Sequence, residues 1–191
     1  MSNILISEER VNSSSFFSSD STPVLVLLSG GIDSTCCVEY YRSRRCCVSA
    51  LFVNYGQPQA ELEQNAVSAI CAYYNIPLRE FAILGSSVSA GYIRARNALL
   101  LTLGLMHFGE SAGIIALGIH SGTPYADCLP EFTSAMQGVF NLYENGNVRI
   151  DTPFLTWTKQ EILLFARANT VPLHMTYSSN PDDIRNLSAS P

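Results

Sequence analysis

A glycine-rich segment that follows an apolar run is the clearest chemical signal in this sequence. Residues 24–28 are all apolar, and residues 29–35 then read Ser-Gly-Gly-Ile-Asp-Ser-Thr. A strand, a glycine turn and a helix in this order place the turn at the crevice where parallel α/β sheets bind ligands. Glycines allow the backbone to approach a ligand closely, and a helix start offers unpaired N–H groups and partial positive charge. We therefore predict a phosphate site at Ser29, Gly30, Gly31, Ser34 and Thr35.

The phosphate chemistry expected here differs from that of a kinase loop. A Walker A loop needs Gly-Lys followed by Ser or Thr, and residues 29–35 contain no lysine. Cleavage between the α and β phosphates of ATP is therefore favoured over transfer of the γ-phosphoryl group. The structural alternative is a plain helix cap, in which the two glycines serve only the turn.

The elements that must position this segment alternate between strands and helices. We predict strands at residues 24–28, 47–53, 78–83, 113–117 and 148–151. We predict helices at about residues 34–44, 59–74, 95–108 and 130–142, followed by a last helix that begins near residue 158. Strands that alternate with helices of this length predict an α/β fold, a parallel five-stranded sheet with helices on both faces.

Two of these helices carry finer predictions. The last helix is expected to have Thr156 or Thr158 as its cap, with Glu161 completing a capping box after Thr158. The helix at residues 59–74 is expected to bury one apolar stripe, made of Leu62, Ala66, Ala69, Ile70 and Tyr73.

Composition limits the partners and the compartment. Of the 191 residues, 47% are hydrophobic and 14% are charged, and the net charge is −5 with Lys159 as the single lysine. We therefore expect no broad basic face and no nucleic-acid partner. No apolar run reaches the ~20 residues of a membrane span, and the serine-rich start does not resemble a secretory signal. We expect no membrane partner and a cytoplasmic location, where the six cysteines would be buried thiols.

The resemblance carried by residues 29–34 extends this interpretation. Ser-Gly-Gly-Ile-Asp-Ser resembles the pyrophosphate loop of the N-type ATP pyrophosphatase (PP-loop) superfamily. The resemblance implies an adenine nucleotide α-hydrolase-like fold and adenylation of a substrate by ATP, with Mg²⁺ assisting. It also implies that the loop holds pyrophosphate, that Asp33 is a candidate Mg²⁺ ligand, and that Ser34, Asp33 and Lys159 are catalytic candidates. We therefore expect a serine-rich arm at residues 1–22, a PP-loop domain at residues 23–175 and a C-terminal tail at residues 176–191.

Further segments narrow the resemblance to the 7-cyano-7-deazaguanine synthases of queuosine biosynthesis. The matching segments, which span roughly residues 23–179, are residues 52–57 with Glu61 soon after, 96–97, 117–120, 125–128, 152–154, 159–162 and 176–178. Arg96, at a helix start, has five donors that could bind phosphate or a substrate carboxylate, and the resemblance implies that Lys159 contacts ATP. It also implies a set of substrate-binding residues: Tyr55, Gln57, Arg96, Asn97, Gly118, His120 and Asp127.

Each of these residues also has a structural alternative. Tyr55 could belong to a simple turn, and Arg96 could only pair with a carboxylate. His120 could be a satisfied structural histidine, Asp127 could cap the helix that follows it, and Lys159 could lie on the surface. A Gly-x-Ser-x-Gly match at residues 109–113 is set aside as a hydrolase nucleophile, because it lies between a helix and a strand in the wrong order.

The chain departs from the synthase pattern near its C-terminus and beside the substrate segment. Ser179 stands where the family has its first zinc cysteine, and no cysteine follows through Pro191. We therefore expect no Cys₄ zinc site. Leu129 stands where family members usually have an arginine, and residues 120–127 form a shorter segment than in a typical synthase. We interpret the chain as a divergent, zinc-free relative.

The function implied is an ATP-dependent ligase that forms a C–N bond. It would adenylate a carboxylate, with 7-carboxy-7-deazaguanine as the expected acid, and pass the acyl group to an amine. Ammonia would give an amide and then a nitrile, whereas a larger amine, even a protein amine, would give an amide conjugate. Two alternatives stay open, namely an adenylating amidase for a different acid and a non-catalytic nucleotide-binding subunit of a larger assembly. The family also implies a homodimer.

Overall fold

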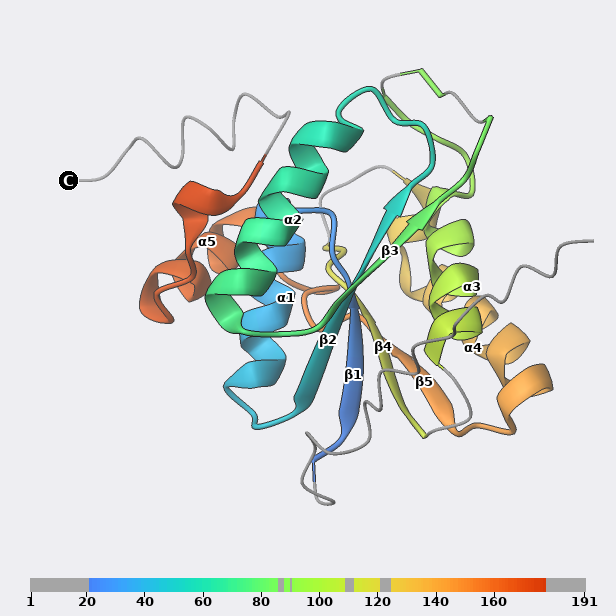
Figure 1. The fold of residues 1–191 in the computed structure, drawn as a ribbon. Helices are drawn as coiled ribbons and strands as arrows, with labels where there is room; N and C mark the ends of the chain where they lie inside the picture. Colours follow the sequence, from blue (N-terminus) through green and yellow to red (C-terminus); the bar gives the residue numbers. More distant parts are fainter. Residues whose placement is uncertain (1–20, 86–87, 90, 109–111, 121–124, 178–191) are drawn as a thin grey trace, which may run out of the picture.

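A parallel sheet lies at the centre of the computed structural model, which describes residues 21–85, 88–89, 91–108, 112–120 and 125–177. The described strands are β1 (Pro23–Leu27), β2 (Cys47–Asn54), β3 (Leu78–Ala82), β4 (Gly113–Leu117) and β5 (Val148–Asp151). Their order is β3-β2-β1-β4-β5, and every neighbouring pair is parallel (Figure 1). The predicted parallel five-stranded sheet is confirmed.

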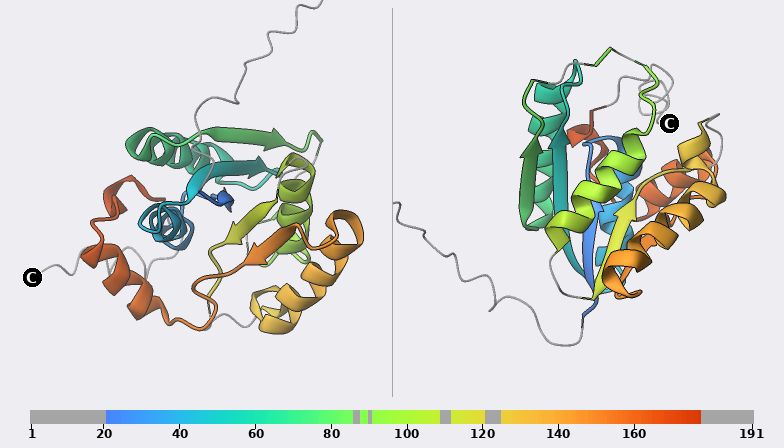
Figure 2. Two further views of the ribbon diagram at one scale, coloured as in Figure 1. Left: turned by 90° about the horizontal axis from the view of Figure 1, so that it is seen from below. Right: turned by 90° about the vertical axis from the view of Figure 1, so that its right-hand side faces the viewer.

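Helices cover both faces of this sheet, as expected. The helices are α1 (Ile32–Arg42), α2 (Ala60–Tyr74), α3 (Arg96–Phe108), α4 (Pro130–Glu144) and α5 (Lys159–Ala168), with short 3₁₀ turns η2 (Ala126–Cys128) and η3 (Leu173–Met175). The layer formed by α1, α2 and α5 covers one face, and the layer formed by α3 and α4 covers the other (Figure 1, Figure 2). The two 3₁₀ turns were not expected from the sequence.

The central strand shows why the sequence folds in this way. Side chains alternate between the two faces of a strand, and in β1 both sets are apolar. Val24 and Val26 pack into the core beneath α1, α2 and α5. Leu25 and Leu27 pack into the separate core beneath α3 and α4. A continuous apolar run is therefore required here, because β1 is buried on both faces.

The strand order places a topological switch point at the carboxyl ends of β1 and β4. From β1 the chain proceeds through α1 to β2 on one side, whereas β4 lies against the other side of β1. The connections that leave the carboxyl ends of β1 and β4 therefore diverge, and open α/β sheets bind ligands at such a switch point. Residues 28–31 and 118–120 follow these two strand ends.

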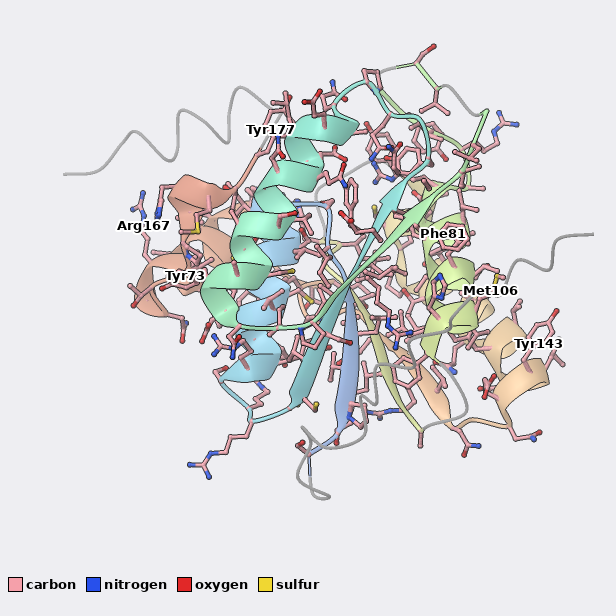
Figure 3. All side chains as sticks on the ribbon, viewed as in Figure 1. Tyr73, Phe81, Met106, Tyr143, Arg167 and Tyr177 are labelled. Carbon is pink, nitrogen blue, oxygen red and sulfur yellow. The ribbon has the colours of Figure 1, made fainter. Side chains whose placement is uncertain are left out.

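The predicted buried stripe of α2 is wrong at three positions. Its buried residues are Ala66, Val67, Ile70, Cys71 and Tyr74. Leu62 and Tyr73 are 52% and 51% exposed, and Ala69 is also exposed. Figure 3 shows Tyr73 at the outer side of the helix. The helix is rotated about its axis, so that the buried face is shifted by about one residue from the predicted one. Its sequence contains two adjacent apolar stripes, and the stripe with Val67 and Cys71 packs against the sheet.

The cap and the cysteines follow the predictions more closely. Thr158, rather than Thr156, caps α5, and its capping box with Glu161 is formed in both directions. All six cysteines are free; four are buried, while Cys46 and Cys47 are only partly buried. Burial raises the pKa of the Cys36 thiol to about 12. This buried group therefore stays a neutral thiol at neutral pH.

Candidate ATP and substrate site

The glycine loop between β1 and α1 has a backbone that only glycine fits at one position. Gly30 has a φ of +78°, and a Cβ atom there would lie 3.0 Å from both Ala66 Cβ and the Glu63 carbonyl oxygen. Gly31 is extended and forms the N-cap of α1, with no side chain capping the helix. The loop is thus pressed against α2, and the start of α1 is left without a side-chain cap.

Hydroxyl groups hold the loop in this shape. Ser34 Oγ accepts a hydrogen bond from Ser29 N at 3.3 Å and lies 3.2 Å from Ser29 Oγ. Ser34 Oγ also donates to Gly31 O at 3.1 Å, and Thr35 Oγ1 donates to the same oxygen at 2.8 Å. Thr35 is fully buried. Its hydroxyl therefore supports the loop from behind, whereas Ser29, Gly31 and Ser34 line a cavity of about 240 Å³.

Two more predicted site residues, Lys159 and His120, lie beside Asp33 at the loop. Lys159 Nζ, from the first turn of α5, donates to Asp33 Oδ1 at 2.8 Å. His120 Nε2, from the segment after β4, lies 3.7 Å from Asp33 Oδ2. The single lysine of the chain is therefore not a remote surface residue. Ammonium and imidazole groups at this distance from the loop could turn toward a phosphate.

Gly118, just after β4, packs closely against the backbone at the start of α1. A Cβ atom on Gly118 would lie 2.9 Å from Asp33 C, Asp33 O and Ser34 N, all of them backbone atoms. Contacts this short to backbone cannot be relieved by a rotamer change. Gly118 also lines the cavity, so its missing side chain both opens space and allows the two elements to meet.

Gln57 organises the segment after β2. Its Nε2 donates to Val53 O at 3.2 Å and to Glu63 Oε2 at 2.8 Å, while its Oε1 accepts from Tyr55 N at 2.9 Å. Both amide protons are used, and the residue is only 7% exposed. Tyr55 lines the cavity beside it, and burial raises the pKa of its phenol, with Arg96 lowering it in part. Gln57 therefore fixes the positions of Tyr55 and Glu63.

Glu63 is a site residue that sequence reasoning missed. It lines the cavity, and burial raises the pKa of its carboxyl, while the hydrogen bond from Gln57 and the charge of Arg96 lower it in part. A signal for it exists in the sequence. Glu63 precedes Ala66 and Val67 by three and four positions, so it lies on the buried stripe that the misplaced orientation of α2 concealed. Glu61, which follows the matching segment, is exposed.

The start of α3 is tied to η2 by two predicted residues. Asn97 N donates to Asp127 Oδ2 at 3.4 Å, and Asn97 Nδ2 donates to Asp127 O at 3.0 Å. Both residues are buried. Asp127 does not cap the helix after it, because the N-cap of α4 is Leu129 and no side chain caps that end. Arg96 precedes Asn97, donates to Asn97 Oδ1 at 3.4 Å and lines the cavity.

A second, outer cavity of about 420 Å³ adjoins the first. The two share Tyr55, Gln57, Glu63 and Arg96, and Asp127 lines only the outer one. Tyr92 and Tyr125 also line the outer cavity, with their rings stacked at a centroid distance of 4.8 Å and an interplanar angle of 12°. Tyr92 was not predicted as a site residue, because no motif or period marks it. Such aromatic surfaces suit a planar ring.

Several sequence predictions fall on parts of the chain outside the described residues. These are residues 1–20 of the predicted arm at 1–22, residues 109–111 of the Gly-x-Ser-x-Gly match, residues 121–124, and residues 178–191 of the predicted tail, which include Ser179. Within the described ranges, no group of three or more His, Cys, Asp or Glu side chains is placed to hold a metal ion. None of the helices in those ranges combines the length and the apolar character that crossing a membrane requires.

Comparison with known families agrees with the resemblance expected from the sequence. The family model described as "Queuosine biosynthesis protein QueC" matches residues 23–86 and 83–187. The 7-cyano-7-deazaguanine synthase 2 of Desulfitobacterium hafniense strain Y51 is 33% identical over 184 residues, covering 81% of this chain and 78% of the relative. The 7-cyano-7-deazaguanine synthase of Acetivibrio thermocellus is 28% identical over 180 residues, covering 80% of this chain and 81% of the relative. The predicted resemblance is confirmed.

Two solved structures have a similar fold. The U34-tRNA thiolase NcsA of Methanococcus maripaludis has a TM-score of 0.55 at 17% identity, covering 84% of this chain but only 60% of its own. The NMN synthetase of Francisella tularensis has a TM-score of 0.54 at 16% identity, covering 86% of this chain and 68% of its own. At these identities the two likenesses concern the fold alone, and they agree with the predicted α/β fold.

Proposed function

Because this chain belongs to the family of the queuosine biosynthesis protein QueC, we propose that it adenylates a carboxylate with ATP and passes the acyl group to an amine. Membership makes the chain an ATP-dependent enzyme that forms C–N bonds. The acid that we propose is 7-carboxy-7-deazaguanine. The observation that carries the proposal is the loop at residues 29–35, which lines a cavity at the switch point of the sheet.

The loop supports a role in holding the pyrophosphate part of ATP. The start of α1 lacks a side-chain cap, and the hydroxyls of Ser29 and Ser34 lie beside it at the cavity. Backbone N–H groups at a helix start, together with hydroxyl donors, form a site for linked phosphates. Lys159 and Arg96 would contact the phosphates from two further sides.

Asp33 is the residue that we propose as the protein ligand of Mg²⁺. Magnesium is commonly held by one or two carboxylates together with substrate phosphates, and Asp33 is a carboxylate at the loop that lines the cavity. The ion would supply charge neutralisation on the phosphates. Lys159, now 2.8 Å from Asp33 Oδ1, would then turn from the carboxylate toward ATP.

The proposed reaction has two bond exchanges. An oxygen of the substrate carboxylate attacks the α-phosphorus of ATP, the bond to the β-phosphate oxygen breaks, and pyrophosphate leaves. The chain's own residues act by positioning and by stabilising the charge that develops on pyrophosphate. The amine nitrogen then attacks the acyl carbon and loses a proton, and AMP leaves with the electron pair of the broken C–O bond.

The product depends on the amine. Ammonia would give a primary amide, which a second ATP could activate so that its oxygen leaves on AMP and a nitrile forms. A larger amine, including a protein amine, would stop the reaction at an amide conjugate. The stacked Tyr92 and Tyr125 and the nearby Asp127 support a planar nitrogen-containing acid in the outer cavity.

We propose a PP-loop domain at residues 23–175 that acts as a cytoplasmic homodimer, with ATP and a small acid as its partners and no nucleic acid. Two other functions compete with the ligase. The first is adenylation and amidation of a different acid, which the exposed Leu129 in place of the family arginine favours. The second is a nucleotide-binding subunit without turnover.

Mass spectrometry and pyrophosphate release test the proposal together. Full-length protein is incubated with ATP, Mg²⁺, ammonium and 7-carboxy-7-deazaguanine, and we expect AMP, pyrophosphate and a deazapurine amide or nitrile. Exchange of pyrophosphate into ATP with another acid only would favour the different-acid enzyme. Binding of ATP without exchange for any acid would favour the non-catalytic subunit.

A loop variant links this activity to the loop. Ser34→Ala removes a hydroxyl that lines the cavity and bonds within the loop, and we expect turnover to fall about tenfold or more. Ser43→Ala changes an exposed serine just after the same helix and should leave turnover unchanged. Equal turnover by Ser34→Ala and wild type would refute the loop assignment.

A further inference from the structure

A carboxylate lies where the two cavities meet, and adenylation by itself does not account for it. Glu63 lines both the inner cavity of about 240 Å³ and the outer cavity of about 420 Å³. Asp33 lines only the inner cavity and Asp127 only the outer one. Among the residues that the structure describes, Glu63 is therefore the acid that faces both spaces, at the junction that ATP and the acid must share.

This position is unfavourable for the anions that the site must bring together. ATP carries its phosphates in the inner cavity, and the substrate carboxylate must reach the α-phosphorus from the outer one. A like charge in a partly buried site repels both. Arg96, which also lines both cavities, can bind an anion there. An ionised Glu63 accepts hydrogen bonds only, so it suits a cation.

The carboxylate is held in place from one side. Gln57 Nε2 donates to Glu63 Oε2 at 2.8 Å, and the other interactions of Gln57 fix it to Val53 and Tyr55. The backbone of Glu63 also packs against the glycine loop at Gly30. Burial raises the pKa of the Glu63 carboxyl, which makes it a better proton acceptor than an exposed glutamate. Its position is thus set by the same elements that set the ATP loop.

We propose that Glu63 binds the protonated amine that captures the acyl-adenylate, and accepts the proton that this amine must lose before it can attack. The inference rests on the proposed function, because it requires an acyl-adenylate formed at the loop. An N–H of the ammonium group donates to Glu63 and its proton passes to the carboxylate. The freed lone pair attacks the acyl carbon, the C–O bond to AMP breaks, and its electron pair leaves on AMP. The second nitrogen proton and the proton on Glu63 then pass to solvent.

The Glu63→Gln variant separates amine capture from adenylation. Glutamine keeps the size of the side chain and can still accept the Gln57 hydrogen bond, but it neither attracts ammonium nor takes its proton. With ammonium chloride as the probe, we expect amide formation to fall about 100-fold. Pyrophosphate exchange with ATP should not fall, because the variant removes a negative charge that repels both anions. Hydroxylamine is mostly unprotonated at neutral pH, so it should capture the acyl-adenylate equally well in both proteins.

A control variant and three contrary outcomes test the role of Glu63 separately from the proposed adenylation activity. Glu61→Gln changes an exposed glutamate on the same helix and should match wild type in every assay. The inference is overturned if Glu63→Gln forms amide as fast as wild type, or if it loses exchange and hydroxylamine capture to the same degree. It is also overturned if wild type yields the hydroxamate but no amide from ammonium. Absence of exchange in wild type itself would instead refute the proposed function.

Discussion

Two carboxylates lie beside a loop that is suited to anions, and each has a cation in its neighbourhood. Asp33 is held by Lys159 at 2.8 Å, and Arg96 lies near enough to Glu63 to lower the pKa of its carboxyl in part. Lys159 is thereby held beside the loop, and Arg96 lines the cavity. When phosphates enter, each cation can exchange its carboxylate for a phosphate oxygen, since both are acceptors of charge-assisted hydrogen bonds.

Lys159 is the residue where this exchange can be measured. We expect Lys159→Met to raise the KM for ATP about tenfold or more, because a charge-assisted hydrogen bond to phosphate contributes about 1.5–3 kcal/mol. Lys159→Arg keeps the charge but presents a planar fork instead of a compact ammonium, so we expect an intermediate KM. Steady-state kinetics of pyrophosphate release at varied ATP would check this.

The control for this prediction is a charge removed elsewhere on the same helix. Arg167 lies exposed in the last turn of α5 (Figure 3), and Arg167→Gln should leave the KM for ATP at its wild-type value. A Lys159→Met enzyme with normal ATP kinetics would mean that Lys159 serves only to neutralise Asp33.

At the scale of elements, the site depends on how closely β4 approaches α1. Gly118→Ala would place a Cβ atom 2.9 Å from three backbone atoms of residues 33 and 34. We expect a loss of about 1–3 kcal/mol in the free energy of unfolding, as for overpacked cores, together with weaker ATP binding. Urea unfolding and a titration with ATP would measure the two effects.

A second glycine provides the matched control for this change. Gly138 lies in α4, and a Cβ atom added there would point into open space, with nothing within 4 Å beyond its own helix. Alanine is favoured over glycine in a helix by about 0.5–1 kcal/mol. Gly138→Ala should therefore be as stable as wild type or more so, with unchanged ATP binding. Similar losses in both variants would show that Gly118 has no special contact with α1.

The segment after η3 also contacts the loop, through a backbone hydrogen bond. Tyr177 N donates to Gly30 O at 2.9 Å, and Tyr177 lies near the start of α2 (Figure 3). Tyr177→Pro removes this donor, and the extended backbone of Thr176 (φ −80°, ψ 149°) is compatible with a following proline. Since a hydrogen bond contributes about 1 kcal/mol, we expect the KM for ATP to rise about fivefold.

Tyr177→Phe tests whether the backbone donor or the phenol matters. This variant keeps the N–H group and the ring, so its ATP kinetics should equal those of wild type. If the phenylalanine variant were as impaired as the proline variant, the contact of Tyr177 N with Gly30 would not explain the effect.

Sequence patterns predicted elements better than they predicted orientation. The strands and helices were predictable because apolar runs and 3.6-residue periods are local properties. The direction that α2 faces was not, because it depends on which of two adjacent stripes fits the sheet, and the error concealed Glu63. The contact of Asp127 with Asn97 joins residues far apart in the chain. Tyr92 likewise becomes a candidate only through its stacking on Tyr125, which lies far away in the chain. No local sequence pattern predicts that contact.

In the whole molecule, two separate hydrophobic cores, one on each face of the sheet, support different parts of the site. One core lies beneath α1, α2 and α5, which carry the loop, Glu63 and Lys159. The other lies beneath α3, which carries Arg96, and α4. The inner cavity is therefore lined by residues from both layers, such as Ser34 of α1 and Arg96 of α3.

One buried hydrogen bond ties the first layer to the far strand of the sheet and gives global stability a pH dependence. Tyr41 Oη, on α1, donates to Asp151 Oδ2 at the end of β5 at 2.6 Å, and Tyr41 is only 3% exposed. Burial raises the pKa of the Tyr41 phenol, with Cys37 and Asp151 adding to the effect. The folded state thus keeps the proton to higher pH than the unfolded state, whose tyrosine ionises near pH ~10.

The sign of this linkage predicts how Tyr41→Phe should behave. A raised native pKa contributes stability that is complete below pH ~10 and is lost as the pH rises further. At neutral pH we expect the variant to lose about 0.5–1.5 kcal/mol of unfolding free energy with the hydrogen bond. Above pH ~10 the wild type should lose up to about 1.4 kcal/mol per pH unit more than the variant, so the two curves converge. Urea unfolding from pH ~7 to ~11 would follow this, with exposed Tyr143 (Figure 3) changed to phenylalanine as the control. Curves for Tyr41→Phe and wild type that ran parallel into the alkaline range would show that Tyr41 does not govern the titration.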